Sequence, residues 1–438
     1  MRYAAAAITV LVGTASARQC QNITVEVTVS ARNGIFNQTT PATNIDVTNF
    51  ILNFTQPGMN YSATLINGVL THGLGFDRSY WDLPYNNYNY SYVKEAVDEY
   101  GYSTLAWDRL GTGMSQHGEP VNEIQALLEV DALRALTENL RNGLIPGVSN
   151  KFCKVIHVGH SFGSLHTYTL AAEHSSISDG IALTGFSQIG AGLSSEFTFA
   201  ANYIQANTLP ALAAYPNGYL AFGGLSAVQS IFFSPNQFDP GLVSTIFNTQ
   251  KPITVGEALT SIGETATINN FAGPVLIITG NRDLPFCSGN CLAAPNNLTS
   301  IPEVSKKTIP YAKNFEVVIV PNAAHGLNLE YSHPFTYATI NNYFIANGLA
   351  ANISCFAVTV SSGSNTGSNS SSAASATTEP NPSGACASGS SISTTSSASG
   401  TDTTAASATS AAGQSVTSAS TKAGSLHNKH PTGYQSVV

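Results

Sequence analysis

Three residues in this sequence have the types that nucleophilic catalysis needs: Ser161, Asp283 and His325. A serine hydroxyl is a poor nucleophile at neutral pH. It becomes reactive when a histidine within hydrogen-bond reach takes its proton and a carboxylate orients that histidine. Each of the three residues follows an apolar run that predicts a buried strand. Because parallel strands end at the same edge of a sheet, we expect the three side chains to meet there.

Ser161 lies in the pentapeptide GHSFG, between a β-branched run at 155–158 and residues that resume at helical spacing from Ser164. A strand that turns into a helix within so few residues crowds the neighbours of the serine, and glycines at 159 and 163 relieve that crowding. This stretch resembles the nucleophile elbow of the α/β-hydrolase superfamily. The alternative is a serine that only caps a helix.

The resemblance implies a role for each of the three residues. Members of the superfamily carry the nucleophile, the acid and the histidine in that chain order. On this basis Ser161 is the nucleophile, Asp283 the acid and His325 the base. Serine at the elbow argues against epoxide hydrolase and haloalkane dehalogenase chemistry, because those members of the superfamily use an aspartate at this position.

Two backbone N–H groups are candidates for an oxyanion hole. Phe162 begins the helix behind the serine. The free N–H groups and the positive dipole end of this helix point toward any oxyanion formed at Ser161. The second candidate is Leu74 in the HGLG loop at 72–75, which resembles the oxyanion loop of the superfamily. An ordinary glycine-rich turn is the alternative there. The segment DRLGTGMS resembles the DxxGxGxS loop of the superfamily, which gives Asp108 a structural role.

Other histidines and acids compete for the catalytic roles. His166 lies inside the elbow helix, His157 belongs to the buried strand, and His333 follows the last strand at a greater distance. Some relatives place the acid after the preceding strand, but here no carboxylate occurs in that stretch before Glu196. The sequence therefore favours His325 and Asp283.

The alternation of strand and helix predicts an α/β fold in which helices cover both faces of a mostly parallel sheet. Apolar residues at helical spacing predict a crossover helix at 121–140, and a helix at 335–349 is expected to close the domain. The expected strands cover residues 24–30, 47–54, 63–70, 104–107, 155–158, 180–186, 274–280 and 315–321. The expected organisation is a signal peptide (1–17), a hydrolase core in two parts (18–187 and 271–358), an inserted helical cap (188–270) and a low-complexity tail (359–438).

The expected cap is rich in apolar residues. No charged side chain occurs between Glu196 and Asp239, whereas Phe, Tyr and Leu are frequent. An apolar inner face of the cap would favour a lipophilic substrate. The alternative is that these residues only pack the cap against the core.

Several features predict export from a eukaryotic cell. The N-terminus has an apolar stretch followed by small residues, which is typical of a signal peptide. Glycosylation sequons begin at Asn22, Asn37, Asn53, Asn60, Asn89, Asn297, Asn352 and Asn369. The six cysteines are then expected to form disulfides. Cys287 and Cys291 can close a small loop. The pairing of Cys20, Cys153, Cys355 and Cys386 stays open, and Cys153 with Cys355 is one option because both are expected at the same end of the sheet.

Beyond about residue 360 the chain consists largely of Ser, Thr, Ala and Gly, a composition that cannot bury a core. We expect an O-glycosylated stalk that can associate with the cell wall, and no lipid anchor, because the C-terminus is not apolar. The net charge of −8 argues against nucleic acid or anionic membrane as a partner. No apolar run is long enough for a membrane span. The chemistry requires neither a metal nor a cofactor.

The sequence thus predicts a secreted serine hydrolase that cleaves carboxylic esters of a lipophilic substrate through an acyl-enzyme. The layout is similar to that of secreted fungal hydrolases of unassigned substrate. One alternative keeps the triad but changes the bond, as in a peptidase resembling the proline aminopeptidases, or a lactonase. Another is a non-catalytic, wall-associated binding protein on a hydrolase scaffold.

Overall fold

The computed structural model describes residues 20–27, 29, 31, 33–52, 70–148, 152–188, 195–261, 268–295 and 297–351. The expected signal peptide, the expected strand 63–70 up to residue 69, and the expected tail lie outside the described residues.

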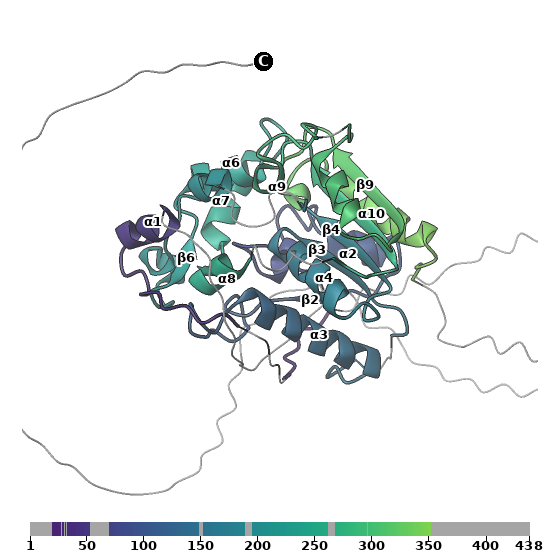
Figure 1. Cartoon of the computed structure of the whole chain (residues 1–438), viewed down its shortest axis with the longest axis horizontal. Coiled ribbons are helices and arrows are strands. Elements are labelled where there is room, and N and C mark those ends of the chain that lie inside the picture. Colours follow the sequence, from purple (N-terminus) through teal and green to yellow (C-terminus); the bar gives the residue numbers. More distant parts are fainter. Residues whose placement is uncertain are drawn as a thin grey trace, which may run out of the picture. The chain divides into compact units, whose positions relative to one another are not determined.

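The core of the described chain is a six-stranded, fully parallel sheet with the strand order β2-β1-β3-β4-β8-β9. The predicted parallel sheet is therefore confirmed (Figure 1). The strands are β1 Leu70–Thr71, β2 Ala106–Trp107, β3 Ile156–His160, β4 Gly180–Thr184, β8 Pro274–Gly280 and β9 Lys313–Val320.

Helices cover both faces of this sheet. All five residues of β4 are buried, and since successive side chains of a strand point to opposite faces, neither face of β4 meets solvent. Helices α3 and α4 pack against each other and α4 contacts β3 and β4, whereas α10 packs against α2 and β8. These helices are α2 Tyr92–Asp98, α3 Ala126–Asn142, α4 Phe162–Glu173 and α10 His333–Ala346.

The order of the strands creates a switch point between β1 and β3. Leu70 of β1 pairs with Ala106 of β2 on one side and with Val158 of β3 on the other. The chain therefore passes from β1 to β2 on one side of β1, and then continues to β3 on the other side of β1. Loops that follow two such strands diverge, and the space between them is where open α/β sheets bind ligands. The loop 72–75 and the turn at Ser161 lie at this point.

The segment expected to form a helical cap contains helices and also a small sheet. Its strands β5, β6 and β7 form an antiparallel sheet in that order, which the sequence did not predict because each strand has only two or three residues. The elements are α5 Ser195–Ala201, β5 Ile204–Gln205, η2 Ala206–Thr208, η3 Pro210–Leu212, β6 Tyr219–Ala221, α6 Leu225–Phe232, α7 Pro240–Thr249, β7 Ile253–Thr254 and α8 Val255–Thr260.

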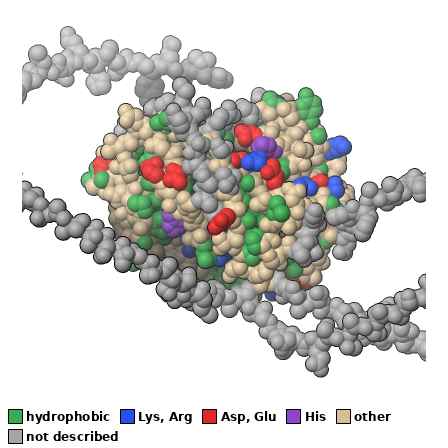
Figure 2. Space-filling model, turned by 90° about the horizontal axis from the view of Figure 1, so that it is seen from below, with side chains coloured by type: hydrophobic (Ala, Val, Ile, Leu, Met, Phe, Trp, Pro, Cys, Tyr) green, Lys and Arg blue, Asp and Glu red, His purple; other side chains and the backbone are tan. Residues whose placement is uncertain are grey.

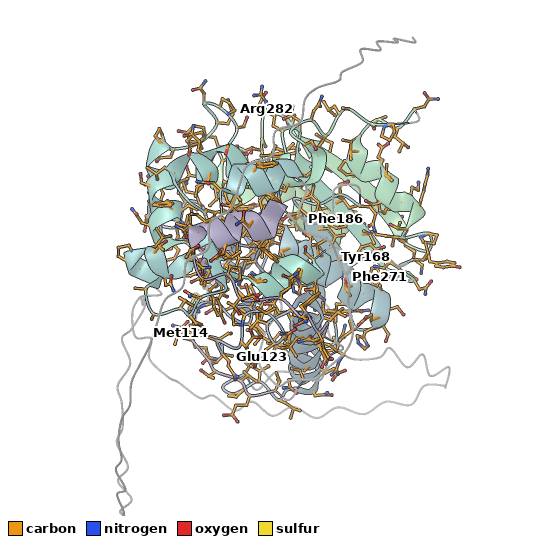
Figure 3. The ribbon with its side chains drawn as sticks, turned by 60° about the vertical axis from the view of Figure 1, so that its left-hand side comes forward. Met114, Glu123, Tyr168, Phe186, Phe271 and Arg282 are labelled. Carbon is orange, nitrogen blue, oxygen red and sulfur yellow. A yellow bond between two sulfur atoms is a disulfide. The ribbon has the colours of Figure 1, made fainter. Side chains whose placement is uncertain are left out.

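After the cap the chain returns to the core along helix α4. Asn269 donates its side-chain amide to the carbonyl of Tyr168 at 2.8 Å. The ring of Tyr168 stacks on Phe186, with 5.9 Å between their centroids, and Phe271 is buried nearby (Figure 3). The remaining described elements are η1 Arg78–Tyr80, α9 Leu284–Cys287, η5 Ile301–Lys307 and η6 Leu327–Leu329.

The N-terminal region differs from the prediction. The described residues of the segment 24–30 form no strand, and residues 44–52 form helix α1 Asn44–Leu52 in place of the expected strand 47–54. Thr43 and Asp46 account for the helix, since the Thr43 N–H donates to Oδ2 of Asp46 at 2.9 Å and the Asp46 N–H donates to Oγ1 of Thr43 at 3.2 Å. This reciprocal capping prevails over the weak β-propensity of the apolar residues that follow.

Charged side chains are sparse on the surface. Lysine and arginine side chains do not gather into a continuous basic area on the face shown in Figure 2. Within the described ranges no helix combines the length and the apolar character that crossing a membrane demands.

His157 at the beginning of the central strand β3 gives a test of the core. Its Nε2–H donates to Oγ1 of Thr137 at 2.9 Å, because that hydroxyl already donates to Leu133, and its Nδ1 accepts from Ser178 at 2.7 Å. Burial lowers the pKa of His157 to about 3. In the unfolded chain the pKa of this histidine is roughly 6.5. As the pH falls below that value, the histidine is protonated in the unfolded chain but not in the folded chain, so the folded state loses stability.

We expect His157→Gln to remove this contribution. Between pH 6 and pH 4 the free energy of unfolding of the variant should fall by about 1.4 kcal/mol less per pH unit than that of the wild type. Urea unfolding at several pH values measures both slopes. His117→Gln is the matched control, because the side chain of His117 is exposed. Equal slopes for His157→Gln and the wild type would contradict this account of the core.

Candidate active site

Ser161 occupies a strained backbone position at the turn from β3 to α4. Its φ of 56° and ψ of −119° are rare for a residue with a side chain. The two flanking glycines are required by space: a Cβ on Gly159 would lie 2.2 Å from the carbonyl oxygen of Gly163, and one on Gly163 would lie 2.1 Å from that of Thr71. The N–H of Ser161 donates to the carbonyl of Thr184 at 2.9 Å. The turn thus presents a partly exposed serine above the sheet edge.

Asp283 follows β8 and caps the short helix α9. Its Oδ1 accepts from the N–H of Phe286 at 2.9 Å, and its Oδ2 accepts from the hydroxyl of Thr279 at 2.6 Å. The carboxylate is fully buried, whereas the neighbouring Arg282 points outward and is exposed (Figure 3). The acid is therefore held by hydrogen bonds and not by an ion pair with Arg282.

The structure brings His325 to this carboxylate. Nδ1 of His325 lies 2.7 Å from Oδ2 of Asp283, and the imidazole is 1 % exposed. An ionised carboxylate only accepts hydrogen bonds, so Nδ1 carries the proton and Nε2 is free to accept one. The rings of Phe232 and Phe286 stack against the imidazole, with centroid distances of 5.8 Å and 5.7 Å. The imidazole of His325 is fixed in tautomer by Asp283 and in orientation by two apolar rings.

The described side chains of Ser161 and His325 are not joined by a hydrogen bond, but a residue next to Ser161 contacts His325. The ring of His160, the residue before the serine, lies 4.8 Å from that of His325. A Cβ on Gly185 would meet Cε1 of both rings at 2.9 Å. Such contacts are often loose without substrate and tighten in the reacting complex.

The two candidate oxyanion donors flank the serine. A Cβ on Gly73 would lie 2.8 Å from Cβ of Ser161, so the loop 72–75 packs directly against the nucleophile. Within the described chain neither the N–H of Leu74 nor that of Phe162 donates a hydrogen bond. Both donors remain available for a negatively charged oxygen at the serine.

Glu330, which was not predicted from the sequence, organises the loop that carries His325. One carboxylate oxygen of Glu330 accepts from the N–H of Ala324 at 2.8 Å and the other from the N–H of Ser234 in the cap at 2.5 Å. Burial raises the pKa of Glu330 to about 8, with the two N–H bonds acting in the opposite direction. The only signal in the sequence is an isolated acid within the apolar run GLNLEY.

The cap and the histidine loop are joined by further backbone hydrogen bonds. The N–H of Gly326 donates to the carbonyl of Phe232 at 2.9 Å, and the N–H of Tyr331 donates to that of Gln237 at 2.8 Å. On the other side of the site, the N–H of Lys251 donates to the carbonyl of Gly75 at 2.9 Å. The cap therefore contacts the histidine loop and the loop 72–75.

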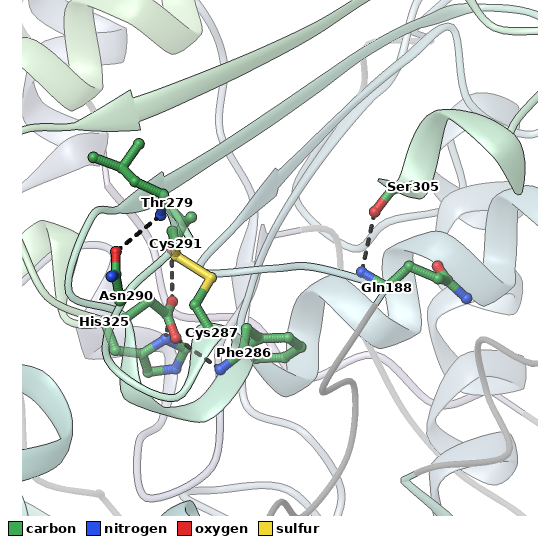
Figure 4. Close-up of a disulfide and its surroundings, with 10 residues drawn as sticks. Gln188, Thr279, Phe286, Cys287, Asn290, Cys291, Ser305 and His325 are labelled. Atoms are coloured by element: carbon green, nitrogen blue, oxygen red, sulfur yellow. Dashed lines mark hydrogen bonds and ion pairs between the residues drawn. A yellow bond between two sulfur atoms is a disulfide. The ribbon is translucent and has the colours of Figure 1, made fainter. Parts of the chain in front are cut away.

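A disulfide closes the loop behind the acid. Cys287 and Cys291 are bonded, as predicted, and both are buried beside Phe286 and His325 (Figure 4). The N–H of Cys291 also donates to the carbonyl of Asn281 at 2.9 Å. Cys153 is disulfide-bonded, but the partner expected for it, Cys355, lies outside the described residues, so this pairing stays a prediction.

The competing residues lie in structural positions. His166 contacts Glu129 at 2.9 Å, and His333 contacts the carbonyl of Glu330 at 2.8 Å. Asp108 accepts from the N–H groups of Arg78 and Met114, at 3.0 Å and 2.9 Å, and forms an ion pair with the side chain of Arg78, which is a structural role. Among the residues that the structure describes, no group of three His, Cys, Asp or Glu side chains could hold a metal ion.

Comparisons with known proteins gave both structural matches and a family match. The chain is similar to a thermophilic esterase from Thermogutta terrifontis, with 16% identity, a TM-score of 0.43, and coverage of 74% of this chain and 99% of that one. It is also similar to a monoacylglycerol lipase from Paleococcus ferrophilus, with 15% identity, a TM-score of 0.41, and coverage of 64% and 93%. No curated protein sequence gives a significant match. The profile of the alpha/beta hydrolase family matches residues 69–339, more than half of the chain, and the protein therefore belongs to that family.

Proposed function

We propose that this protein is an exported serine hydrolase that cleaves carboxylic esters of lipophilic substrates. The observation that carries the proposal is the 2.7 Å hydrogen bond between Asp283 and His325, formed beside a strained serine with two unused N–H donors. This combination supplies a base of defined tautomer, a nucleophile and a site for developing negative charge.

The proposed reaction is acyl transfer in two steps. Nε2 of His325 takes the proton of Ser161 as its Oγ attacks the ester carbonyl, and the N–H groups of Leu74 and Phe162 stabilise the oxyanion. The imidazolium then gives its proton to the leaving alcohol as the carbon–oxygen bond breaks. Water, deprotonated by the same histidine, releases the acid and regenerates the serine. Asp283 stays ionised throughout and stabilises the imidazolium.

The surroundings of the histidine support a lipophilic substrate. Phe232 also makes edge contacts with Phe76 and Phe222, with centroid distances of 5.1 Å and 5.5 Å. A Cβ on Gly75 would lie 2.3 Å from the ring of Phe222, so this aromatic cluster reaches the loop 72–75. An apolar acyl or alcohol group fits such surroundings better than a charged one. The lack of acids between Glu196 and Asp239 argues against recognition of a substrate ammonium group.

Export is proposed on two observations. The disulfide between Cys287 and Cys291 is of a kind that persists in oxidising compartments. Among the described sequons, the asparagine side chains of Asn22, Asn37, Asn89 and Asn297 are all exposed, as attachment of a glycan requires.

Labelling with a fluorophosphonate tests the nucleophile. We expect the wild type to be labelled and Ser161→Ala not to be labelled, because only a serine with an adjacent base attacks phosphorus at a useful rate. Ser226→Ala, which changes an exposed serine of the cap, is the control and should be labelled like the wild type. Equal labelling of all three proteins would remove Ser161 from the proposed role.

Asp283→Asn tests the acid. Loss of the charge that orients and stabilises the histidine should lower kcat on a p-nitrophenyl ester by roughly 10³ to 10⁴-fold, with KM changed little. Steady-state kinetics measure both constants, and thermal unfolding checks that the variant is folded. A folded variant with the kcat of the wild type would show that another group orients His325.

A substrate panel tests the bond and the lipophilic preference. We expect kcat/KM to increase from short-chain to medium-chain p-nitrophenyl esters by about tenfold, since each buried methylene adds favourable transfer free energy. Aminoacyl anilides and simple lactones should react more slowly than the best ester. Preferred turnover of an anilide would indicate a peptidase, and preferred turnover of a lactone a lactonase.

A further inference from the structure

A buried ion cluster adjoins the oxyanion loop and is not part of the proposed triad. The side chains of Arg109, Glu129 and Glu257 are all 0 % exposed. Nη1 of Arg109 donates to Oε1 and Oε2 of Glu129, at 3.1 Å and 2.9 Å, and to Glu257 of the cap. His166 of the elbow helix contacts Glu129 at 2.9 Å. Burying charges is costly, so such a cluster is by itself weak evidence that it stabilises the fold. Its contacts with the residues around Ser161 point to another role.

The cluster is linked to the loop 72–75 through His72. The backbone N–H of Arg109 donates to Nε2 of His72 at 3.0 Å. Nε2 is therefore the accepting nitrogen, and the proton of the neutral ring lies on Nδ1. Nδ1 lies 2.9 Å from the carbonyl oxygen of Gly73, which can only accept. The guanidinium of Arg109 contacts the same oxygen at 3.4 Å.

Through the planar peptide bond between Gly73 and Leu74, these contacts determine the direction of the Leu74 N–H. The carbonyl of Gly73 and the N–H of Leu74 belong to one planar trans peptide, in which they point in opposite directions. Two donors that hold the oxygen of Gly73 therefore aim the N–H of Leu74 away from the cluster. Gly73 packs against Cβ of Ser161, so the peptide that carries this N–H begins beside the serine.

The same cluster contacts the second oxyanion residue. The guanidinium of Arg109 lies over the ring of Phe162, 4.9 Å from its centroid. Nδ1 of His166 lies 2.6 Å from the carbonyl oxygen of Phe162, while its Nε2 faces Glu129. The loop after β1 and the beginning of α4 are thus tied to one buried group of charges.

We propose that His72, held in one tautomer by the N–H of Arg109 and backed by the Arg109–Glu129–Glu257 cluster, is a positioning residue that orients the Leu74 N–H toward the reacting oxygen. The inference rests on the proposed function, because it concerns an oxyanion formed at Ser161. His72 itself touches neither the substrate nor the reacting atoms.

Two variants of His72 separate orientation from packing. In His72→Asn the amide nitrogen takes the place of Nδ1 and can still donate to Gly73, but the acceptor for Arg109 is lost. In His72→Gln the amide oxygen takes the place of Nε2 and can still accept from Arg109, but the donor to Gly73 is lost. Both variants remove the buried ring. We expect kcat on the best ester to fall roughly 10² to 10³-fold in His72→Gln with KM nearly unchanged, and at most about tenfold in His72→Asn.

An alkyl boronic acid provides a second measurement. Its tetrahedral adduct with the serine places an oxygen in the oxyanion hole, so its inhibition constant should rise in His72→Gln by a factor similar to the loss of kcat/KM. If His72 had a purely structural role, both variants would have a lower melting temperature. The inhibition constant of the boronic acid would then not rise in proportion to the loss of kcat/KM. Equal losses of kcat in the two variants, or an unchanged kcat in His72→Gln, would overturn the inference.

The wild-type protein provides a check that needs no variant to fold. Nitrogen-15 NMR of histidine-labelled protein should show His72 neutral, with the proton on Nδ1 at neutral pH, and the opposite tautomer would overturn the inference. Its failure is distinct from failure of the proposed function. A wild type that hydrolyses esters while His72 has the wrong tautomer rejects only the inference. A wild type that hydrolyses no ester and resists the fluorophosphonate rejects both.

Discussion

The hydrogen bond between Asp283 and His325 depends on the pairing of two neighbouring strands. Gly280 of β8 and Val320 of β9 are in register, and Asp283 and His325 follow within a few residues of these two ends. The loops are then fixed locally, by the capping of α9 on one side and by Glu330 on the other. A contact that must be accurate to a fraction of an ångström is therefore produced by short loops on a rigid sheet.

Much of this arrangement could be predicted from the sequence. The apolar runs before Ser161, Asp283 and His325 identified the strands, and the common edge of a parallel sheet brought the acid and the base together. Gly159 was interpretable because its cause is local: a Cβ there would strike the carbonyl oxygen of Gly163 in the same turn, whereas a Cβ on Gly163 would strike Thr71 of the neighbouring strand. Features determined by nearest neighbours along the chain are visible in the sequence.

Features determined by distant partners were not visible. Arg109 and Glu257 lie 148 positions apart, and nothing near either residue indicates that both charges are buried together. Helix α1 is a different case, because its capping by Thr43 and Asp46 is local; it was predicted as a strand because its apolar residues suit either structure. The cap sheet was missed because strands of two or three residues are defined by their pairing and not by a pattern.

The hydrogen bonds between the cap and the histidine loop restrict how the enzyme can admit its substrate. Phe232, Ser234 and Gln237 are bonded directly to the loop that carries the base. If this part of the cap moved away from the core as a rigid body, its hydrogen bonds to the loop would pull the imidazole of His325 away from the carboxylate of Asp283. Under the proposed function, a substrate would enter by a route that leaves these hydrogen bonds intact, so that opening of the site would not disturb the pair of Asp283 and His325.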